Sequence, residues 1–366
     1  MAHVIVVGAG AIGSHVLGHV ARMRAVTRVT VIDPQAYAAD NAWNQDINSI
    51  DVGKSKAQAQ VRRMKRIRHD VAAAALQLSV EAVPLGCLRA DVILGCVDSR
   101  RARMAINQAA WRLGVPWIDA GIDASGLVRV QAFVPAGGGA CLECAWSVDD
   151  YALVEQAYPC MGDPEVPPSS ASSSLGALAA ALQAVECEKL LVGEHAYALV
   201  GRDLLIDVRH HRHFVTSYAA SNACRMPDHC GWQCRPLDLD PASATVTDLL
   251  AGAWPGPVDR VEMELGVAGC TVALAATCQP CGVRTEGLAV LRAGQSTAWP
   301  CPHCGGLCST SGFDTRDAVA IDALPPSARA TALSILGITA HDVVTVGTRA
   351  AITRLELGGN TWSTAC

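Results

Sequence analysis

Short apolar runs alternate with longer amphipathic stretches over roughly the first third of the chain, and this rhythm predicts alternating strands and helices. Strands that alternate with helices in this way form βαβ units, in which right-handed crossovers build a parallel sheet covered by helices. We therefore predict an α/β fold with a doubly wound, mostly parallel sheet. The strands are expected at 3–7, 29–32, 75–83, 91–96, 116–120 and 128–134, and the helices at 14–23, 54–68 and 100–113.

The pattern becomes irregular after this region. A stretch at 141–170 contains several prolines and the start of a serine run, and it shows no regular hydrophobic period. An apolar helix is expected at 175–191, followed by two strand-like segments at 198–207 and 213–218. These elements complete the first domain.

Residues 236–241 have the composition of a linker. We therefore predict two domains, one of residues 1–235 and a smaller one of residues 236–366. The second domain is expected to be α+β, and it ends in a helical pattern at 326–336 and a strand pattern at 343–357.

Composition agrees with this division. A chain of 366 residues is longer than one ordinary core supports. Its residues are 51% hydrophobic and only 17% charged, as expected when parallel strands are buried on both faces.

A net charge of −5 argues against nucleic acid or a membrane surface as a partner. The chain starts in a core strand without a basic leader, and its apolar stretch at 175–185 is too short to span a bilayer, so we expect a cytoplasmic protein.

Sixteen cysteines in a cytoplasmic chain indicate metal sites rather than disulfides. Two C-x-x-C pairs in the second domain are each followed by glycine, and they consist of Cys278, Cys281, Cys301 and Cys304. Matched pairs of this kind are typical of a zinc ribbon with four thiolate ligands. A redox dithiol is the less favoured alternative.

The first predicted strand runs directly into the turn Gly8-x-Gly10-x-x-Gly13, and a helix follows at once. This is the phosphate-binding arrangement of a βαβ unit, in which glycines allow a tight turn and the helix N-terminus attracts an anion. The second strand ends in Asp33, where an acid is placed to bind a ribose hydroxyl. Alone, the turn is most often an NAD or FAD site.

Two charged residues suggest a triphosphate instead. Lys56 lies near the start of a basic helix, where it can neutralise phosphates, or it belongs to a solvated helix face. Asp98 follows a buried strand at the edge where ligands bind, so it can hold Mg²⁺, or it caps the next helix. Other polar side chains that accompany them are Asn41, Asn44, Gln45, Arg103 and Asn107.

Taken in order, these signals resemble the ubiquitin-activating-enzyme superfamily with its Rossmann-like ThiF/MoeB/HesA adenylyltransferase fold. The resemblance covers about residues 3–234. It rests on the glycine turn, Asp33, Asn41 with Gln45, Gly53-x-x-Lys56, Asp98 with Arg103 and Asn107, Gly114-Val115-Pro116, Cys141-x-x-Cys144, and Gln183 to Glu186 with Lys189.

The resemblance implies a function. Members of this superfamily bind ATP and Mg²⁺ and adenylate the C-terminal glycine carboxylate of a ubiquitin-like or sulfur-carrier protein. It implies that Asp33 holds the ribose, Lys56 the phosphates and Asp98 the Mg²⁺, while Asn41 and Gln45 line the nucleotide pocket. It also implies a homodimer, and a conjugating enzyme is a further expected partner.

Two departures from the family pattern stand out. The family usually has arginine before the glutamine, and Asn44 takes that place here. Many members also carry a helix before the first strand, whose arginine reaches the partner subunit's ATP site, and we expect no such helix in this chain. Either another basic residue replaces the arginine, of which Lys54 is nearest, or adenylation is weak.

Many members pass the acyl group to a cysteine in a flexible crossover. Cys160 fits that position by distance, and its setting Tyr-Pro-Cys-Met-Gly-Asp-Pro is typical of a loop. A nucleophilic thiol needs access and a lowered pKa, which nothing in the sequence guarantees. Cys160 is therefore the predicted thioester cysteine, with a free or structural thiol as the alternative.

Cys141 and Cys144 need two more ligands to hold zinc. The resemblance implies that these come from the end of the same domain. There we favour Cys224 together with His229 or Cys230. Such a zinc would stabilise the fold rather than take part in catalysis.

Two other functions stay open at this point. An NAD-dependent oxidoreductase would use the glycine turn and Asp33 but leaves Lys56, Asp98 and the cysteines unexplained. A catalytically weak scaffold of the same fold agrees with Asn44 in place of arginine. A third version keeps adenylation but acts on a short peptide or a tRNA base.

Overall fold

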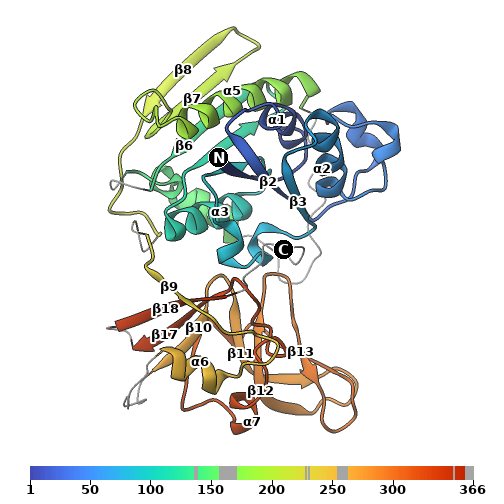
Figure 1. Ribbon diagram of the computed structural model, residues 1–366, viewed down its shortest axis with the longest axis vertical. Helices are drawn as coiled ribbons and strands as arrows, with labels where there is room; N and C mark the ends of the chain where they lie inside the picture. The colour runs from blue at the N-terminus through green and yellow to red at the C-terminus, as the bar shows by residue number, and fades with distance from the viewer. Residues whose placement is uncertain are drawn as a thin grey trace. The chain divides into compact units, whose positions relative to one another are not determined.

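The computed structural model of the chain describes residues 1–135, 139–155, 171–226, 229, 231–253, 263–348 and 351–358. The chain divides into two compact units (Figure 1). The first consists of Met1–Val80 with Leu88–Gly231, and the second of Glu81–Cys87 with the chain from Trp232 onward. The domain limits 1–235 and 236–366 remain a prediction. Among the described residues, no helix is both long and apolar enough to cross a membrane.

The first unit is built on an eight-stranded sheet with the order β3-β2-β1-β4-β5-β6-β7-β8. The five strands from β3 to β5 pair in parallel, and the last three pair antiparallel. This confirms the predicted Rossmann-like, mostly parallel sheet. The strands are β1 (Ala2–Val7), β2 (Val26–Ile32), β3 (Ala72–Leu76), β4 (Val92–Gly95), β5 (Trp117–Ile122), β6 (Leu127–Phe133), β7 (Arg202–Asp207) and β8 (Arg212–Ser217).

Helices and single 3₁₀ turns connect these strands. Helix α5 packs against β4, β5 and β6 and against helix α1, so it covers the sheet beside the first crossover (Figure 1). The helices are α1 (Gly13–Val20), α2 (Lys56–Ile67), α3 (Arg100–Leu113), α4 (Val148–Glu155) and α5 (Ser173–Leu191). The 3₁₀ turns are η1 (Ala39–Trp43), η2 (Ser49–Asp51), η3 (Val80–Ala82), η4 (Leu85–Leu88) and η5 (Leu142–Ala145).

Local sequence explains where α3 begins and ends. The Ser99 side chain accepts a hydrogen bond from the backbone N–H of Ala102 at 3.0 Å, so Ser99 is the N-cap of α3. The helix ends at Gly114, whose left-handed φ of +69° suits glycine. Asp98 therefore does not cap this helix, and that alternative reading of its role is wrong.

The core of the first unit lies between the sheet and its helices. Val4, Val6, Val29, Val31 and Leu94 are fully buried, because strands of a parallel sheet are covered on both faces. Side chains of α1 and α5 complete the same cluster. Burial of this apolar surface holds the carboxyl ends of β1, β2 and β4 together.

The second unit contains two sheets. One has the order β16-β10-β17-β18-β9, and the other has β12-β11-β14-β13 with β15 paired to β11. The elements are β9 (Cys234–Leu237), α6 (Val246–Ala253), β10 (Glu264–Val267), β11 (Thr271–Cys278), β12 (Arg284–Leu291), β13 (Thr297–Pro300), β14 (Leu307–Ser309), β15 (Thr315–Arg316), β16 (Ala318–Ala320), α7 (Pro326–Arg329), β17 (Val343–Thr348) and β18 (Ala351–Leu357).

The helix expected at 326–336 is shorter than predicted. Helix α7 ends at Arg329, and the chain turns because Leu333 N–H bonds to Ala244 O at 2.9 Å and Ala332 bridges to Thr245. Pairing with a distant segment thus competes with the helical hydrogen bonds.

The expectation of no disulfides is also wrong at one position, since Cys87 is disulfide-bonded.

The glycine turn gives a test of the fold. A Cβ at position 13 would lie 1.9 Å from the carbonyl oxygen of Gly8, whereas one at position 10 would meet nothing within 4 Å. We expect Gly13→Ala to lower the free energy of unfolding by about 2 kcal/mol or more, because the backbone must shift. The matched control Gly10→Ala should change it by less than about 0.5 kcal/mol. Urea unfolding measures both, and equal losses would contradict the close approach.

Candidate functional site

The glycine turn between β1 and α1 is braced by Asp33. One Asp33 oxygen accepts the backbone N–H of Ala9 at 2.7 Å, and the other accepts that of Gln35 at 2.8 Å. The Tyr37 hydroxyl donates to the Ala9 carbonyl at 2.8 Å. Helix α1 has no side-chain cap at its start, and the backbone N–H groups of Ser14 and His15 donate to Gly10 O and Ile12 O, both at 3.0 Å. The positive end of the helix dipole still favours an anion there. The turn is therefore held in shape by the loop that follows β2.

Lys56 is the first residue of α2 and is only 6% exposed. Its ammonium donates to the Gln35 side-chain oxygen at 2.8 Å and lies 5.6 Å from the centre of the Tyr37 ring. Burial lowers the pKa of Lys56, and the negative charges of Asp33 and Asp98 act in the opposite direction. Lys56 is thus not on a solvated helix face. Gln35 links Lys56 to Asp33, and Asp98 follows β4, which pairs with β1, so the charges of both carboxylates act on Lys56.

Asp98 follows the end of β4 and is exposed to solvent. With Ser99 as the helix cap, the Asp98 carboxylate is left at the carboxyl edge of the sheet. Ligands bind at this edge in open α/β sheets. The structure therefore brings together Gly8 to Gly13, Asp33, Lys56 and Asp98.

The loop after β2 carries the predicted amide residues. The Asn41 side chain accepts the backbone N–H of Ala38 at 2.9 Å, so it stabilises η1. Asn44 follows η1 as its C-cap and is half-buried. In the described part of the chain, the side-chain oxygens of Gln45 and Gln60 are buried without a hydrogen-bond partner. Two buried acceptors without donors are a feature that a polar ligand can satisfy.

Arg103 and Asn107 have partners within the protein. The Arg103 guanidinium pairs with Asp119, which is 3% exposed, at 3.0 Å between Nε and Oδ1. The buried Asn107 side chain donates to Glu143 at 3.1 Å and accepts the Leu142 N–H at 3.2 Å. Asn107 therefore positions the segment that contains Cys141, and a nucleotide contact for Arg103 remains a prediction.

Sequence reasoning missed what Gln35, Tyr37 and Gln183 do. Gln35 connects Asp33 to Lys56, and Tyr37 connects the glycine turn to the same loop, so their place shortly after Asp33 was the available signal. The fully buried Gln183 donates to Gly95 O at 3.0 Å and to Ile118 O at 2.9 Å, which ties α5 to the ends of β4 and β5. Its resemblance to the family helix gave no hint of these partners.

Four ligand atoms converge in the first unit, and all lie within 4.8 Å of one another. The Cys141 sulfur lies 3.6 Å from that of Cys224 and 3.2 Å from His229 Nε2. Among the described residues His229 completes this group with Cys144, whereas Cys230 lies outside them. Three thiols and an imidazole form a set that could hold a metal ion.

The second unit contains a similar group. The sulfurs of Cys278, Cys281, Cys301 and Cys304 all lie within 4.8 Å of one another. The Cys301 sulfur also accepts a hydrogen bond from the His303 backbone at 3.4 Å, as thiolates in zinc knuckles do. Four clustered sulfurs are a donor set that could hold a metal ion.

Cys160, the predicted thioester cysteine, lies outside the described residues.

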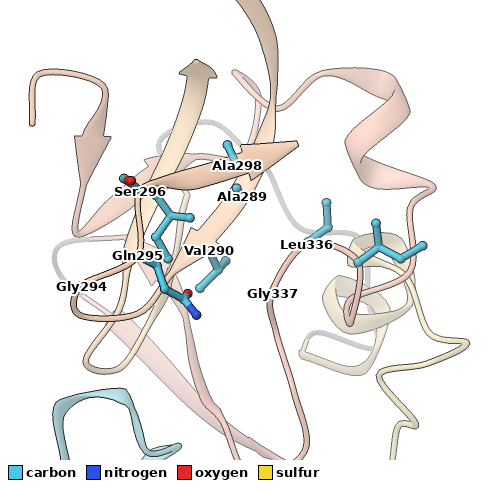
Figure 2. A pocket seen from close by; sticks show the side chains of 10 residues that line it. Ala289, Val290, Gly294, Gln295, Ser296, Ala298, Leu336 and Gly337 are labelled. Atoms are coloured by element: carbon cyan, nitrogen blue, oxygen red, sulfur yellow. The ribbon is translucent and has the colours of Figure 1, made fainter. Parts of the chain in front are cut away.

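The second unit also has a cavity of about 450 Å³, which Figure 2 shows. It is lined by Val290, Gly294, Gln295 and Leu336 among others, and none of the described residues that line it is ionisable. Such a cavity offers shape but no charge for a phosphate. It is therefore not the site in which the predicted residues meet.

The comparison with protein families decides what this arrangement is. The model of the ThiF family matches residues 1–226. The chain belongs to the ThiF family. This confirms the resemblance found in the sequence, and the family region contains the glycine turn, Asp33, Lys56 and Asp98.

Similar proteins are known from several organisms. Ubiquitin-like modifier-activating enzyme 5 of Oryza sativa subsp. japonica is 29% identical over 158 residues, which is 39% of this chain and 37% of the relative. The sulfur carrier protein ThiS adenylyltransferase of Escherichia coli (strain K12) is 27% identical over 145 residues, 39% of this chain and 57% of the relative. The chain thus spans less than two thirds of the length of either protein.

Solved structures show the same fold. The crystal structure of E. coli MccB with succinimide has a TM-score of 0.52 and 21% sequence identity, and the match covers 63% of this chain and 67% of that chain. At this level of identity the similarity concerns the fold alone.

Gln183 provides a test of how the site is held. Gln183→Leu removes the donor to two buried strand carbonyls, so we expect it to lower the free energy of unfolding by about 2 kcal/mol. Glu188→Gln, at an exposed position of the same helix, is the control and should be close to neutral. Urea unfolding of both variants measures the difference. A neutral Gln183→Leu would show that these hydrogen bonds do not support the site.

Proposed function

We propose that the chain is an ATP-dependent adenylyltransferase that activates the C-terminal glycine carboxylate of a ubiquitin-like or sulfur-carrier protein. The observation that carries this proposal is the meeting of Asp33, Lys56 and Asp98 beside the glycine turn. One buried cation and two carboxylates at a helix N-terminus suit a nucleotide with several phosphates and a divalent cation.

The residues present fit ATP and Mg²⁺. The α1 N-terminus and Lys56 supply positive charge for phosphates. A carboxylate has about four acceptor sites, so Asp33 can still accept a ribose hydroxyl besides its two backbone donors. Gln45 offers a buried acceptor, and Asp98 offers an exposed carboxylate of the type that Mg²⁺ prefers. Asn41, Asn44 and Arg103 complete the proposed nucleotide-binding set.

The chemistry asks for positioning more than for a strong base. The substrate carboxylate is already ionised, and its oxygen attacks the α-phosphorus of ATP while the bond to pyrophosphate breaks. Lys56 and the helix N-terminus offset the negative charge that builds up on the phosphate oxygens. The bound Mg²⁺ would neutralise charge on the leaving pyrophosphate.

Family membership and the names of the two relatives support an adenylyltransferase over an NAD-dependent oxidoreductase. The oxidoreductase also gives no role to Lys56 and Asp98. A weak scaffold of the same fold remains the second candidate, because Asn44 stands in place of the family arginine. The carrier protein, a homodimer, a conjugating enzyme, a cytoplasmic location and transfer to Cys160 are parts of the proposal.

The proposal predicts how two residues affect the first reaction. Lys56→Met should lower ATP–pyrophosphate exchange by about 100-fold or more, because a charge that stabilises the transition state is lost. Asp98→Ala should lose most of the exchange activity, and the activity that remains should no longer depend on Mg²⁺. Arg62→Met, an exposed position on the same helix, should keep the exchange rate of the unmodified protein. Exchange that survives in Lys56→Met and Asp98→Ala would refute the site.

We further propose that both cysteine groups bind zinc, and that the group in the second unit forms a zinc ribbon. Their ligand atoms already lie at separations that suit one tetrahedral ion each. The ribbon would recruit the carrier protein or a conjugating enzyme. Neither zinc ion takes part in the adenylation step.

Metal analysis tests the zinc sites separately. The purified protein should contain about two zinc ions per chain. Cys144→Ser and Cys301→Ser should each remove about one of them, because a ligand is lost. Cys234→Ser, which changes a cysteine of neither group, should leave the zinc content unchanged. Inductively coupled plasma mass spectrometry measures the number of zinc ions per chain. A protein free of zinc after expression in zinc-rich medium would contradict both sites.

A further inference from the structure

Three polar side chains from separate segments meet beside the glycine turn. The Ser173 hydroxyl lies 3.2 Å from Nε2 of His15. On the other side of the ring, Nδ1 of His15 lies 3.8 Å from the Asp46 carboxylate. Ser173 begins α5, His15 is in the first turn of α1, and Asp46 follows η1. The order serine, histidine, aspartate is that of an activated hydroxyl nucleophile.

The charge of Asp46 acts on the Nδ1 side of the ring at an ion-pair separation of 3.8 Å, which is longer than a hydrogen bond. The Asp46 carboxylate favours a proton on Nδ1, which leaves Nε2 to accept the Ser173 proton. Asp46 is itself held in place, because its backbone N–H donates to the Ser14 hydroxyl at 2.9 Å and its carboxylate pairs with Arg63. The side chains of His15 and Asp46 are 15% and 37% exposed, so the cluster is accessible.

His15 is in the protonation state that a base requires. Burial lowers the pKa of His15, the Asp46 carboxylate raises it, and the positive charges of Arg63 and His19 lower it again. The net direction is downward. The imidazole is therefore neutral near pH 7 and can take a proton.

The cluster adjoins the proposed nucleotide site. His15 is two residues from Gly13, and Asp46 follows Gln45. One turn into α5, a Cβ at Gly176 would lie 2.2 Å from the Ala11 carbonyl oxygen, so the start of α5 touches the glycine turn (Figure 1). A hydroxyl at Ser173 is thus placed near the helix end that we propose binds the phosphates.

The start of α5 adds an electrostatic contribution. Ser172 caps the helix, and its side chain accepts the Leu175 N–H at 3.4 Å. The first N–H groups of a helix have no acceptor within it, and their dipoles favour negative charge. An oxyanion that forms beside Ser173 would therefore be stabilised.

We propose that Ser173 accepts the activated acyl group, with His15 as general base, so that this chain carries its substrate as an oxyester. The inference rests on the proposed adenylation, which supplies the acyl-adenylate. The Ser173 oxygen attacks the acyl carbon, and its proton passes to His15. The new carbon–oxygen ester bond forms as the carbon–oxygen bond to AMP breaks, and AMP leaves with the electron pair. Ser173 and Cys160 are then competing acceptors.

A fluorophosphonate probe tests the nucleophile without any carrier protein or ATP. We expect the probe to label Ser173, and peptide mass spectrometry locates the modified residue. Ser173→Ala should abolish labelling, and His15→Gln should slow it by about 100-fold, because the general base is lost. Ser174→Ala, the next residue of the same helix, should label at the normal rate. Labelling should fall in acid, at a pH below the ordinary imidazole range, because the pKa of His15 is lowered by burial. If the probe does not label the Ser173 hydroxyl, the proposal is wrong.

A second experiment tests the acyl transfer with ATP and a synthetic peptide that ends in Gly-Gly. Intact mass spectrometry should show a covalent adduct that resists dithiothreitol, as an ester does and a thioester does not. In Ser173→Cys the adduct should become sensitive to dithiothreitol. An adduct that is already sensitive in the unmodified protein, and that disappears in Cys160→Ala, overturns the proposal.

The two experiments distinguish a failure of the proposed adenylation from a failure of Ser173 as the acyl acceptor. If pyrophosphate exchange with the peptide runs but no adduct forms, adenylation stands and Ser173 is not the acceptor. If exchange does not run, the proposed function fails for this substrate, while the fluorophosphonate result still decides whether Ser173 is activated.

Discussion

The site depends on one buried carboxylate. Asp33 directly follows β2 and binds two backbone N–H groups, one in the glycine turn and one in its own loop. A hydrogen bond to a charged group is stronger than one between neutral groups, and a buried N–H without an acceptor is costly. The same contact aligns Gln35 with Lys56. The turn, the loop and the first residue of α2 therefore form one connected unit.

Electrostatics extends this unit across the edge of the sheet. Lys56 is buried, which disfavours its charge, and the carboxylates of Asp33 and Asp98 offset that effect. A buried cation with two anions in reach can exchange part of this interaction for a phosphate ligand without losing all its stabilisation. The balance of charge between Lys56 and the two carboxylates thus suits a polyanion that binds together with a divalent cation.

The sequence was sufficient for features that depend on short-range patterns. The sheet, the glycine turn, Asp33 and the cysteine group of the second unit follow from periodicity and spacing, whereas Cys224 and His229 of the first group were implied by the family resemblance. Contacts between distant segments were not predictable in this way. The pairing of Arg103 with Asp119, the early end of α7 and the meeting of Ser173 with His15 each depend on how separate elements pack. No local signal in the sequence records such packing.

The cysteine group of the first unit joins parts of the chain that are far apart, since Cys141 and Cys224 are 83 positions from each other. A metal ion that links them closes a loop containing α5, β7 and β8. Because the four ligands come together only in the folded chain, such an ion would stabilise the closed loop by its binding free energy rather than by constraining the unfolded chain. Opening of the segment that carries Ser173 would then release the ion. The free concentration of the metal would therefore set how often this segment opens away from the sheet.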